Sequence, residues 1–449
     1  MISPRRVSAH VHGPLSRLAW FLWYLAALLV PLLLAWGVIE PPDTTAGGAI
    51  VLSAGLVGFS ALVVAVALPA RLPWLIASFG IETVIVVHRL IALIAVALVL
   101  VHLLAVLVVD PRGLSILDLV HTTRAARAAV VATAALVLIV VLALRRPIRE
   151  PRYEGWRLVH NGLVAIVLLG AWLHVWWLRH LVSHALVAAW FVVSGLLLVA
   201  LAARRWIWLP IRAGKFAYLV TSVRAVPGDG VTLVIQADGH RGLSFTAGQF
   251  VWLKIGSTPF VFEEHPFSIA SSAEHPDRIE FTIKALGDFT ELLGALRPGR
   301  RVFLDGPYGG FTIDGLDDAP GFVFIAAGVG ITPLLSMLRT LADREDPRRN
   351  WLIMSARSQH DLMLRPEVEA VRAHLDLQVI EVVSAPEPGW TGETGRIDHD
   401  LLSRKLPRRA HRLHYFLCGP APMVTSVSHD IAALGVPFRR IHTERFGAV

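Results

Sequence analysis

Long uncharged apolar runs are the feature that most restricts how this chain can fold. Between Leu15 and Val109 the only charged side chains are those of Arg17, Glu40, Asp43, Arg71, Glu82 and Arg89. A bilayer core about 30 Å thick is crossed by roughly 20 apolar residues in a helix. Six runs reach or approach that length, at 18–39, 48–69, 80–109, 128–144, 158–178 and 184–203. We therefore expect six membrane-spanning helices, with the last two joined by a very short turn around 179–183.

The overall composition averages two unlike halves. Hydrophobic residues make up 55% of the 449 residues and charged residues 17%, whereas an ordinary soluble domain is about 25% charged. After Lys215 the balance becomes that of an ordinary globular protein. These values exclude a uniformly soluble enzyme and a disordered chain. The single cysteine, Cys418, excludes an intrachain disulfide framework and any cysteine-ligated zinc or iron–sulfur site.

Arginine distribution orients the expected helices. One set of loops and ends carries Arg5, Arg6, Arg71, Arg145, Arg146, Arg149, Arg152, Arg157, Arg204, Arg205 and Arg212. The opposite loops carry Glu40, Asp43, Asp110 and Asp118, with Arg112 and Arg124 as exceptions. Both termini are therefore expected in the cytoplasm, with the third and fifth helices parallel. The net charge of +8 is better explained by this topology than by nucleic-acid binding. The first run lacks a small-residue cleavage site, so we expect it to be a retained span rather than a signal peptide.

Four histidines lie inside the expected spans at one repeated spacing. His88 and His102 are in the third span, and His160 and His174 are in the fifth. Fourteen residues of helix turn through about 1400°, about 40° short of four full turns, and rise about 21 Å. Each pair thus lies on one helix face. In parallel helices, His88 can meet His160 near the inner side and His102 can meet His174 near the outer side.

Two stacked bis-histidine sites would result. Imidazole binds several metals, but the lack of carboxylate or cysteine partners disfavours zinc. Haem iron takes two axial imidazoles, and its apolar macrocycle fills space between helices. The alternative is that each histidine only hydrogen-bonds a neighbouring helix, which is how we interpret His184 in the sixth span. Arg89 and Arg157 lie near the inner pair and would either meet haem propionates or extend to the membrane interface.

The segment 215–312 predicts a small antiparallel barrel. Short alternating strands at 217–224, 231–235, 250–255, 279–284 and 301–304 are separated by glycines and prolines. A helix start beside glycines offers backbone N–H groups to a pyrophosphate. The segment contains the motifs His265-Pro266-Phe267-Ser268, Gly287-Asp288-Phe289-Thr290, which opens a helix, and Gly306-Pro307-Tyr308-Gly309.

From Gly321 onwards strands alternate with helices, which indicates a parallel sheet. A buried strand at 322–327 leads into Gly328-Val329-Gly330-Ile331-Thr332-Pro333 and a helix at 334–341, with Pro333 at the first helical position. The glycines let a phosphate approach the backbone. Arg357 follows the next strand, 351–356, and is either the ligand of a ribose 2′-phosphate or a solvated loop residue. A late strand, 415–417, runs into Cys418-Gly419-Pro420 and another helix.

Together these motifs resemble the superfamily of transmembrane ferric reductases and NADPH oxidases, including bacterial NADPH-oxidase-like flavocytochromes b. The resemblance runs from about Ser60 to the end of the chain. It implies a six-span, ferric-reductase-like domain with two haems at 1–210. A ferredoxin-reductase-like module would follow, with an FAD-binding antiparallel β-barrel at 211–316 and an NAD(P)H-binding α/β domain at 317–449. The implied cofactors are FAD, two haem b groups and NADPH or NADH, in an integral membrane protein whose dehydrogenase module is cytoplasmic.

The resemblance also implies site residues. Ser268 would lie near the reactive flavin nitrogen, and Cys418 beside the nicotinamide, unless it is simply a small buried strand residue. Glu444 and Phe446 match a terminal Glu-x-aromatic pattern in which the ring covers the flavin. These four are the implied catalytic residues. The implied cofactor-binding residues are His265, Pro266, Phe267, Ser268, Lys284, Gly287, Asp288, Phe289, Thr290, Gly306, Gly328, Gly330, Thr332, Pro333, Arg357, Cys418, Gly419, Pro420 and Phe446.

The implied activity passes electrons from cytoplasmic NAD(P)H through FAD and two haems to an outer acceptor, either O₂, giving superoxide, or a ferric chelate. On the outer side, His121, Arg124, Arg179 and His180 would attract an anionic acceptor or are ordinary interface residues. We expect a lipid bilayer as partner, no nucleic acid and no obligate protein partner. Two alternatives stay open. The membrane half is a haem-free anchor for a flavin reductase, or the protein is a quinone-linked cytochrome.

Overall fold

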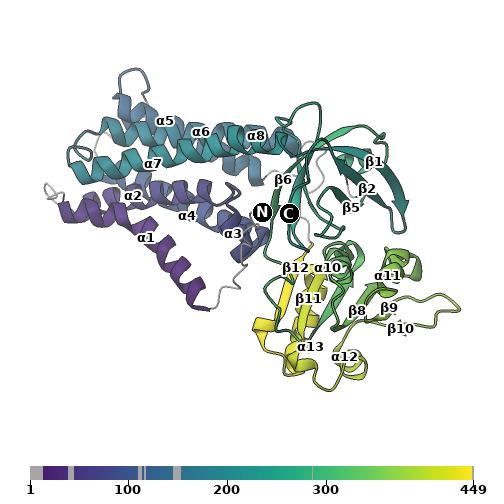
Figure 1. Cartoon of the computed structure of the whole chain (residues 1–449). Helices are drawn as coiled ribbons and strands as arrows, with labels where there is room; N and C mark the ends of the chain where they lie inside the picture. Colours follow the sequence, from purple (N-terminus) through teal and green to yellow (C-terminus); the bar gives the residue numbers. More distant parts are fainter. Residues whose placement is uncertain are drawn as a thin grey trace, which may run out of the picture. The chain divides into compact units, whose positions relative to one another are not determined.

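The computed structural model describes residues 14–38, 45–109, 114–115, 118–144, 153–285 and 287–446. The chain divides into two compact units. Within the described ranges, the helical unit lies in residues 12–72 and 83–208, and the reductase unit lies in residues 73–82 and 209–449. Figure 1 labels the elements of both units.

The helical unit confirms the apolar runs as helices. Its long helices are α1 (Pro14–Val38), α2 (Ala46–Ala67), α4 (Ile81–Val109), α5 (Arg124–Leu144), α6 (Tyr153–Trp177) and α7 (Ala185–Ala203). Among the described residues, α2, α4, α5, α6 and α7 are long and apolar enough to cross a membrane, and α1 has a shorter apolar stretch at Tyr24–Leu34. A π-helical turn, η2 (Arg204–Trp208), and α8 (Leu209–Gly214) follow α7.

Helix ends differ from the predictions by a few residues. Helix α5 begins at Arg124 and α6 at Tyr153, four and five residues before the predicted starts at 128 and 158. His184 is the residue that precedes α7 and not part of the sixth span, and its side chain makes no capping hydrogen bond. Polar residues such as Arg124 extend these helices because a helix continues beyond the apolar core into the interface.

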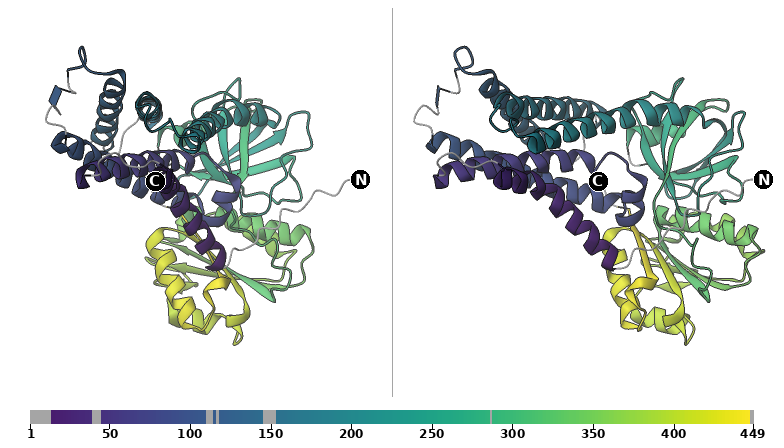
Figure 2. Two further views of the ribbon diagram at one scale, coloured as in Figure 1. Left: turned by 90° about the vertical axis from the view of Figure 1, so that its left-hand side faces the viewer. Right: turned by 60° about the vertical axis from the view of Figure 1, so that its left-hand side comes forward.

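Helices α5, α6 and α7 run side by side (Figures 1 and 2). Gly170 of α6 lets α5 approach, since a Cβ there would lie 2.9 Å from the Cβ of Ala132. Helix α4 is the least covered, with 6% of its most apolar 18-residue stretch buried, against 50% for α2. Such uncovered apolar surface fits lipid or an apolar ligand better than water.

The first domain of the reductase unit is a six-stranded antiparallel sheet, as predicted. Its strands are β1 (Ala217–Val226), β2 (Gly230–Ala237), β3 (Phe250–Ile255), β4 (His265–Ser268), β5 (Arg278–Lys284) and β6 (Arg301–Tyr308), in the order β4-β3-β6-β1-β2-β5. The Ala270 N–H, just beyond β4, donates to the carbonyl oxygen of Glu280 in β5 at 2.8 Å, which joins the two edges into a barrel.

Two further elements complete the barrel domain. The short helix α9 (Asp288–Leu293) begins where the glycine motif predicted. The helix α3 (Pro73–Phe79), which lies between two apolar runs in the sequence, belongs to the reductase unit. Its Ile76 is buried against Phe250 of β3 and Tyr308 of β6. We did not expect this helix, because seven residues carry too little periodicity to predict one.

The second domain is an all-parallel sheet, also as predicted. Its strands are β7 (Gly321–Ala327), β8 (Arg349–Ala356), β9 (Leu377–Val383), β10 (Glu393–Thr394), β11 (His414–Gly419) and β12 (Ile441–Arg445), in the order β10-β9-β8-β7-β11-β12. Alternate residues of β7 enter two separate cores, Phe322 and Phe324 on one face and Val323 and Ile325 on the other. This burial on both faces explains why the strand is uniformly apolar.

Helices cover the parallel sheet. They are α10 (Ile331–Asp343), α11 (Arg365–Arg372), α12 (His399–Lys405) and α13 (Ala421–Ala433), with a single turn η3 (Gly328–Gly330) between β7 and α10. Helix α10 begins at Ile331, three residues before the predicted 334, so Pro333 is its third residue and not its first. The proline is tolerated because N–H groups in the first turn have no intrahelical partner.

Candidate functional site

The carboxyl ends of β7 and β11 meet at the point where the strand order reverses. The chain moves from β7 outward to β8 and β9, and later returns to the other side of β7 at β11. Crevices at such switch points are where open α/β sheets bind ligands. The two predicted nucleotide motifs leave these two neighbouring strands, Gly328-Val329-Gly330 after β7 and Gly419-Pro420 at the end of β11.

The glycines at this switch point are required by close backbone contact. A Cβ on Gly330 would collide with the carbonyl of Cys418, and one on Gly419 would lie 3.1 Å from the Cβ of Ala327. Gly328 has a φ of 54°, in the left-handed region that favours glycine. The loop can therefore approach the end of β11 closely, and its glycines leave the backbone accessible to a phosphate. Pro420 precedes α13 and starts that helix.

Three implied catalytic residues lie together at the same edge. Cys418 of β11 is in register with Glu444 of β12 on one side and with Ala326 of β7 on the other. Paired residues of neighbouring strands point to the same face of a sheet. The Phe446 N–H donates to the Gly419 carbonyl oxygen at 2.9 Å, and its ring packs against the core that contains Cys418. The terminal segment thus covers the end of β11.

Burial keeps the two titratable groups of this cluster neutral. Cys418 is fully buried, and burial, followed by the charges of Glu444 and Glu82, raises the pKa of its thiol. Glu444 is partly exposed as a residue, but its Oε2 is buried and has no hydrogen-bond partner among the described residues. Burial, followed by the negative charge of Glu82, raises the pKa of the Glu444 carboxyl to about 8. A thiol and a protonated carboxyl therefore adjoin the switch point.

The flavin motif forms strand β4, which pairs with β3. Ser268 is in register with Phe250, and Phe250 is in turn in register with Tyr308 of β6. Ser268 is half-buried. The His265 ring stacks on Phe289 with the ring centroids 4.1 Å apart. The structure therefore brings the two predicted flavin motifs together, although 18 residues separate them in the sequence.

The remaining motif residues of the barrel make mostly local contacts. Phe267 lies nearly parallel to Phe289, with 6.1 Å between ring centroids. The Thr290 hydroxyl donates to the Gly287 carbonyl at 2.8 Å and accepts from its N–H at 3.0 Å, so this side chain closes the start of α9. Gly306 of β6 packs against Val251, and Lys284 is exposed at the end of β5. The side chain of Asp288 lies outside the described residues.

A shallow recess lies beside the nucleotide loop, at the carboxyl ends of β7 and β8. It is lined by residues that include Gly328, Ile331, Met354 and Ser355. Arg357 follows β8 two residues after Ser355 and is exposed. In this class of sheet, an arginine at the end of the neighbouring strand can bind the ribose 2′-phosphate of NADPH.

The structure brings the four span histidines together in two pairs, His88 with His160 and His102 with His174. The rings of His102 and His174 lie 6.3 Å apart between centroids. His88 and His160 interact electrostatically, and the His160 ring stacks on Trp156 with centroids 4.9 Å apart. Arg157 is partly buried one turn before His160, whereas Arg89 is exposed.

Three of these histidines each make a hydrogen bond to a backbone carbonyl, which the sequence did not predict. The Nδ1 atoms of His88, His102 and His174 lie 2.7, 2.8 and 2.9 Å from the carbonyl oxygens of Ala65, Val51 and Ala125. A carbonyl only accepts, so each Nδ1 must carry the ring proton, and Nε2 keeps its lone pair. This arrangement orients an imidazole for metal ligation. The acceptors belong to other helices, and no local pattern could have identified them.

The outer polar residues make mostly local contacts. His121 pairs with Asp118 at 2.8 Å, and both side chains are exposed. Arg124 is the first residue of α5, and Arg179 and His180 lie in the turn between α6 and α7.

Family comparisons cover the chain in three parts. Residues 54–171 match the model of the ferric reductase like transmembrane component, residues 215–312 an FAD-binding domain, and residues 324–429 an oxidoreductase NAD-binding domain. The three matches follow the same order as the helices, the barrel and the parallel sheet.

Individual proteins resemble the reductase unit. Ferredoxin--NADP reductase B of Sorangium cellulosum is 34% identical over 220 residues, which are 47% of this chain and 88% of that protein. The reductase component of propane 2-monooxygenase from Rhodococcus jostii is 33% identical over 51% of this chain and 62% of that protein. The crystal structure of an Amycolatopsis cytochrome P450 reductase is 25% identical over 52% of this chain and 70% of that chain, with a TM-score of 0.46.

Proposed function

Because this chain belongs to the superfamily of transmembrane ferric reductases and NADPH oxidases, we propose that it moves electrons across the membrane. It is an NAD(P)H-dependent membrane oxidoreductase with FAD- and NAD-binding domains. In the proposal, electrons from cytoplasmic NAD(P)H pass through FAD and two haem b groups to an acceptor on the outer side. That acceptor is O₂, giving superoxide, or a ferric chelate.

The histidine geometry is the observation that carries the proposal. His88 and His102 on α4, and His174 on α6, each commit Nδ1 to a backbone carbonyl. The Nε2 atoms keep their lone pairs and are suitable iron ligands, and the repeated histidine spacing includes no carboxylate ligand. A histidine that merely joined two helices would need only the Nδ1 bond and no partner ring. His102 and His174 instead face one another at 6.3 Å between centroids, which favours two-sided ligation.

Two kinds of bound group would supply the redox chemistry. FAD converts a two-electron donor into one-electron steps, and haem carries single electrons. His265, Phe267 and Phe289 would line the flavin with their stacked rings, and Ser268 would place its hydroxyl beside the reactive edge. Phe446 would cover the flavin. The neutral thiol of Cys418 and the protonated Glu444 would hold the nicotinamide pocket free of fixed negative charge, which favours the approach of the nucleotide phosphates.

The membrane orientation is part of the proposal. Arg71, Arg204 and Arg205 lie at helix ends on the side from which the reductase unit begins. Arginine-rich loops stay in the cytoplasm, so NAD(P)H would be oxidised there. Arg357 supports NADPH over NADH. His102 and His174 would hold the outer haem, which would supply single electrons to the acceptor.

A difference spectrum of the purified full-length protein tests the haem proposal. We expect b-type absorption on reduction and two haems for each FAD. The variant His102→Ala should lose the outer haem and transfer to the outer acceptor, while flavin reduction by NADPH remains. His184→Ala is the matched control, because this histidine makes no capping bond. If the wild-type protein lacks b-type absorption, the membrane half is a haem-free anchor for a flavin reductase.

A second assay identifies the acceptor. NADPH-driven superoxide formation and ferric chelate reduction are measured side by side, each with and without superoxide dismutase. An O₂-reducing enzyme loses its superoxide signal, and any ferric reduction that superoxide mediates, when the dismutase is present. A ferric reductase keeps its ferric activity. Activity with a soluble quinone alone would instead favour the quinone-linked cytochrome.

A further inference from the structure

One face of α10 carries polar residues although the helix is buried. Thr332, Ser336, Arg339 and Thr340 follow one another at helical spacing and therefore share a side of the helix. Ser336 and Thr340 are fully buried, and Thr332 is 2% exposed. The apolar residues Leu334, Leu338 and Leu341 of the same helix enter the core of the parallel sheet. Buried hydroxyls need partners, and these lie in the flavin barrel.

The buried hydroxyls bond to the backbone of the barrel domain. The Ser336 Oγ donates to the Ser271 carbonyl oxygen at 2.7 Å. The Thr340 Oγ1 accepts the N–H of Ala273 at 2.9 Å. Ser271 and Ala273 lie three and five residues after Ser268, the last residue of the flavin motif, so α10 is attached to the segment that continues strand β4.

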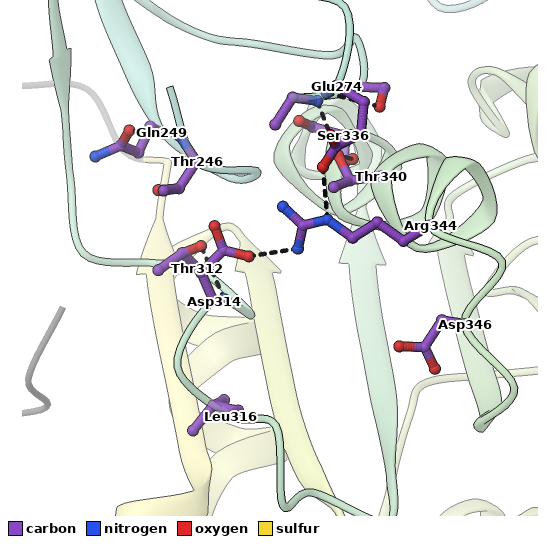
Figure 3. A network of polar contacts seen from close by, with 12 residues as sticks. Thr246, Gln249, Glu274, Thr312, Asp314, Leu316, Ser336, Thr340, Arg344 and Asp346 are labelled. Carbon is purple, nitrogen blue, oxygen red and sulfur yellow. Dashed lines mark hydrogen bonds and ion pairs between the residues drawn. The ribbon is translucent and has the colours of Figure 1, made fainter. Parts of the chain in front are cut away.

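Arg339 of α10 and Arg344, the residue directly after the helix, extend this junction. Arg339 Nη1 donates to the Ala270 carbonyl at 3.0 Å and to the Glu280 Oε2 at 2.8 Å. Arg344 Nε donates to the Glu274 Oε1 at 2.6 Å, and its Nη1 to the Asp314 Oδ1 at 2.7 Å. Figure 3 shows the Arg344 guanidinium between these two carboxylates, with Ser336 and Thr340 beside it. Four charge-assisted bonds and two neutral ones thus join α10 and Arg344 to residues 270–280 and to Asp314.

The charge on Glu280 makes the Arg339 contact a strong one. Glu280 is 4% exposed, and its other oxygen, Oε1, is 2.6 Å from Arg278 Nη1. Burial alone would favour the neutral acid, but Arg339 and Arg278 hold the pKa of Glu280 below its usual value. The carboxylate is therefore ionised at neutral pH and bound from both sides.

The position of α10 gives this junction a meaning for the reaction. The helix starts directly after the glycine loop at 328–330, which would hold the nucleotide phosphates. Its polar face bonds to residues 270–273, which follow the serine that would lie at the flavin. One rigid helix therefore connects the loop that would hold the nucleotide with the segment that would lie beside the flavin. A displacement of about 1 Å between reacting groups can reduce a rate by about a hundredfold.

We propose that the polar face of α10 sets the distance between the nicotinamide and the flavin, with Arg339 as a positioning residue for hydride transfer. This inference rests on the proposed transfer from NAD(P)H to FAD and refines it. Arg339 acts through the helix and the barrel, by its bonds to Ala270 and Glu280, and contacts neither NAD(P)H nor FAD directly. Its removal leaves Glu280 paired with Arg278, so the variant Arg339→Gln should still fold.

Stopped-flow reduction of the full-length, FAD-loaded protein by NADPH provides the test. For Arg339→Gln we expect the limiting rate of flavin reduction to fall on the order of tenfold or more. The NADPH dissociation constant should stay within about twofold, because the residue does not reach the nucleotide. The charge-transfer absorbance between nicotinamide and flavin should weaken. Arg339→Lys should recover part of the rate, since an ammonium can still reach one oxygen of Glu280.

The control is Arg349→Gln, which removes an arginine from the opposite, amino end of β8. Arg349 is exposed and pairs weakly with Asp376 at 4.0 Å. An unchanged limiting rate in Arg339→Gln would overturn the positioning role. So would a parallel loss of FAD content and melting temperature, which would show a merely structural residue. If the wild-type protein itself fails to reduce its flavin with NADPH, the proposed function is wrong, and that result is distinct from a failure of Arg339.

Discussion

At the scale of single residues, the register of β11 and β12 explains why Cys418 and Glu444 belong to one site. They are 26 residues apart in the sequence, yet directly paired across two parallel strands. The shared burial raises the pKa of both groups, so the thiol and the carboxyl are both mostly protonated near neutral pH. Most glutamates are charged and exposed at the surface. Glu444 is instead protonated and lies beside a thiol.

The raised pKa of Glu444 gives a pH dependence of stability. The unfolded carboxyl ionises near its ordinary value of 4.5, whereas the folded one ionises at about 8. The stability contribution is therefore fully present below pH 4.5 and is lost as the pH rises toward about 8. In Glu444→Gln this loss should disappear. Thermal unfolding followed by FAD fluorescence between pH 5.5 and 8.5 measures the difference.

The control for that experiment is Glu369→Gln, which changes an exposed carboxyl of α11. Glu369 pairs only with Arg372 at 3.4 Å, and both side chains are more than half exposed. It should follow the wild-type pH profile. An identical profile in Glu444→Gln would show that this carboxyl does not stay protonated in the folded protein.

At the scale of elements, sequence patterns located most helices and strands, and long-range contacts decided the rest. The strand 250–255 was predicted with its observed limits because its pattern is strongly apolar. Strand β4 was recognised only as a motif, since four residues with a proline carry little strand signal. Strand β12 was missed because Ile441–Arg445 is polar, and its pairing with β11 supplies the stability.

The glycine loop gives a prediction at this scale. In Gly330→Ala the new Cβ would collide with the Cys418 carbonyl, so η3 must move away from β11. Overpacking of this kind costs about 1 to 3 kcal/mol of folding free energy. We expect a lower melting temperature together with a several-fold weaker NADPH affinity, measured by flavin reduction at increasing NADPH concentrations.

Gly294→Ala is the matched control for this prediction. Gly294 ends α9 in a right-handed helical conformation, and a Cβ there would make ordinary contacts of 3.6 Å and longer. It should be tolerated. Equal behaviour of the two variants would mean that the loop does not need the close approach to β11.

At the scale of the whole molecule, the chain combines a membrane-spanning unit with a reductase unit that resembles a ferredoxin--NADP reductase and the reductase component of a propane 2-monooxygenase. The boundary between the units is not simply a point in the sequence. Residues 73–82, between two apolar runs, belong to the reductase unit. Their helix α3 buries Ile76 in the barrel domain, so the reductase unit is assembled from segments on both sides of the apolar helices.

The proposed topology predicts sidedness. NADPH does not cross membranes. NADPH added to inverted membrane vesicles should therefore reduce the flavin, because the reductase unit faces the outside of these vesicles. NADPH added to sealed right-side-out vesicles should not reduce it. Detergent should restore equal activity to both preparations. Flavin reduction by NADPH in intact right-side-out vesicles would place the reductase unit on the outer side and contradict the arginine-based orientation.

The sequence by itself determined the membrane helices, the two histidine pairs and the succession of barrel and parallel sheet. These features follow from local hydropathy and periodicity, which report the face that each element buries. Only the tertiary structure decided which carbonyls fix the histidine tautomers, that Cys418 and Glu444 share a neutral environment, and that the polar face of α10 joins the flavin barrel. Those contacts connect residues from about 20 to about 70 positions apart, and only the folded backbone brings such partners within hydrogen-bonding distance.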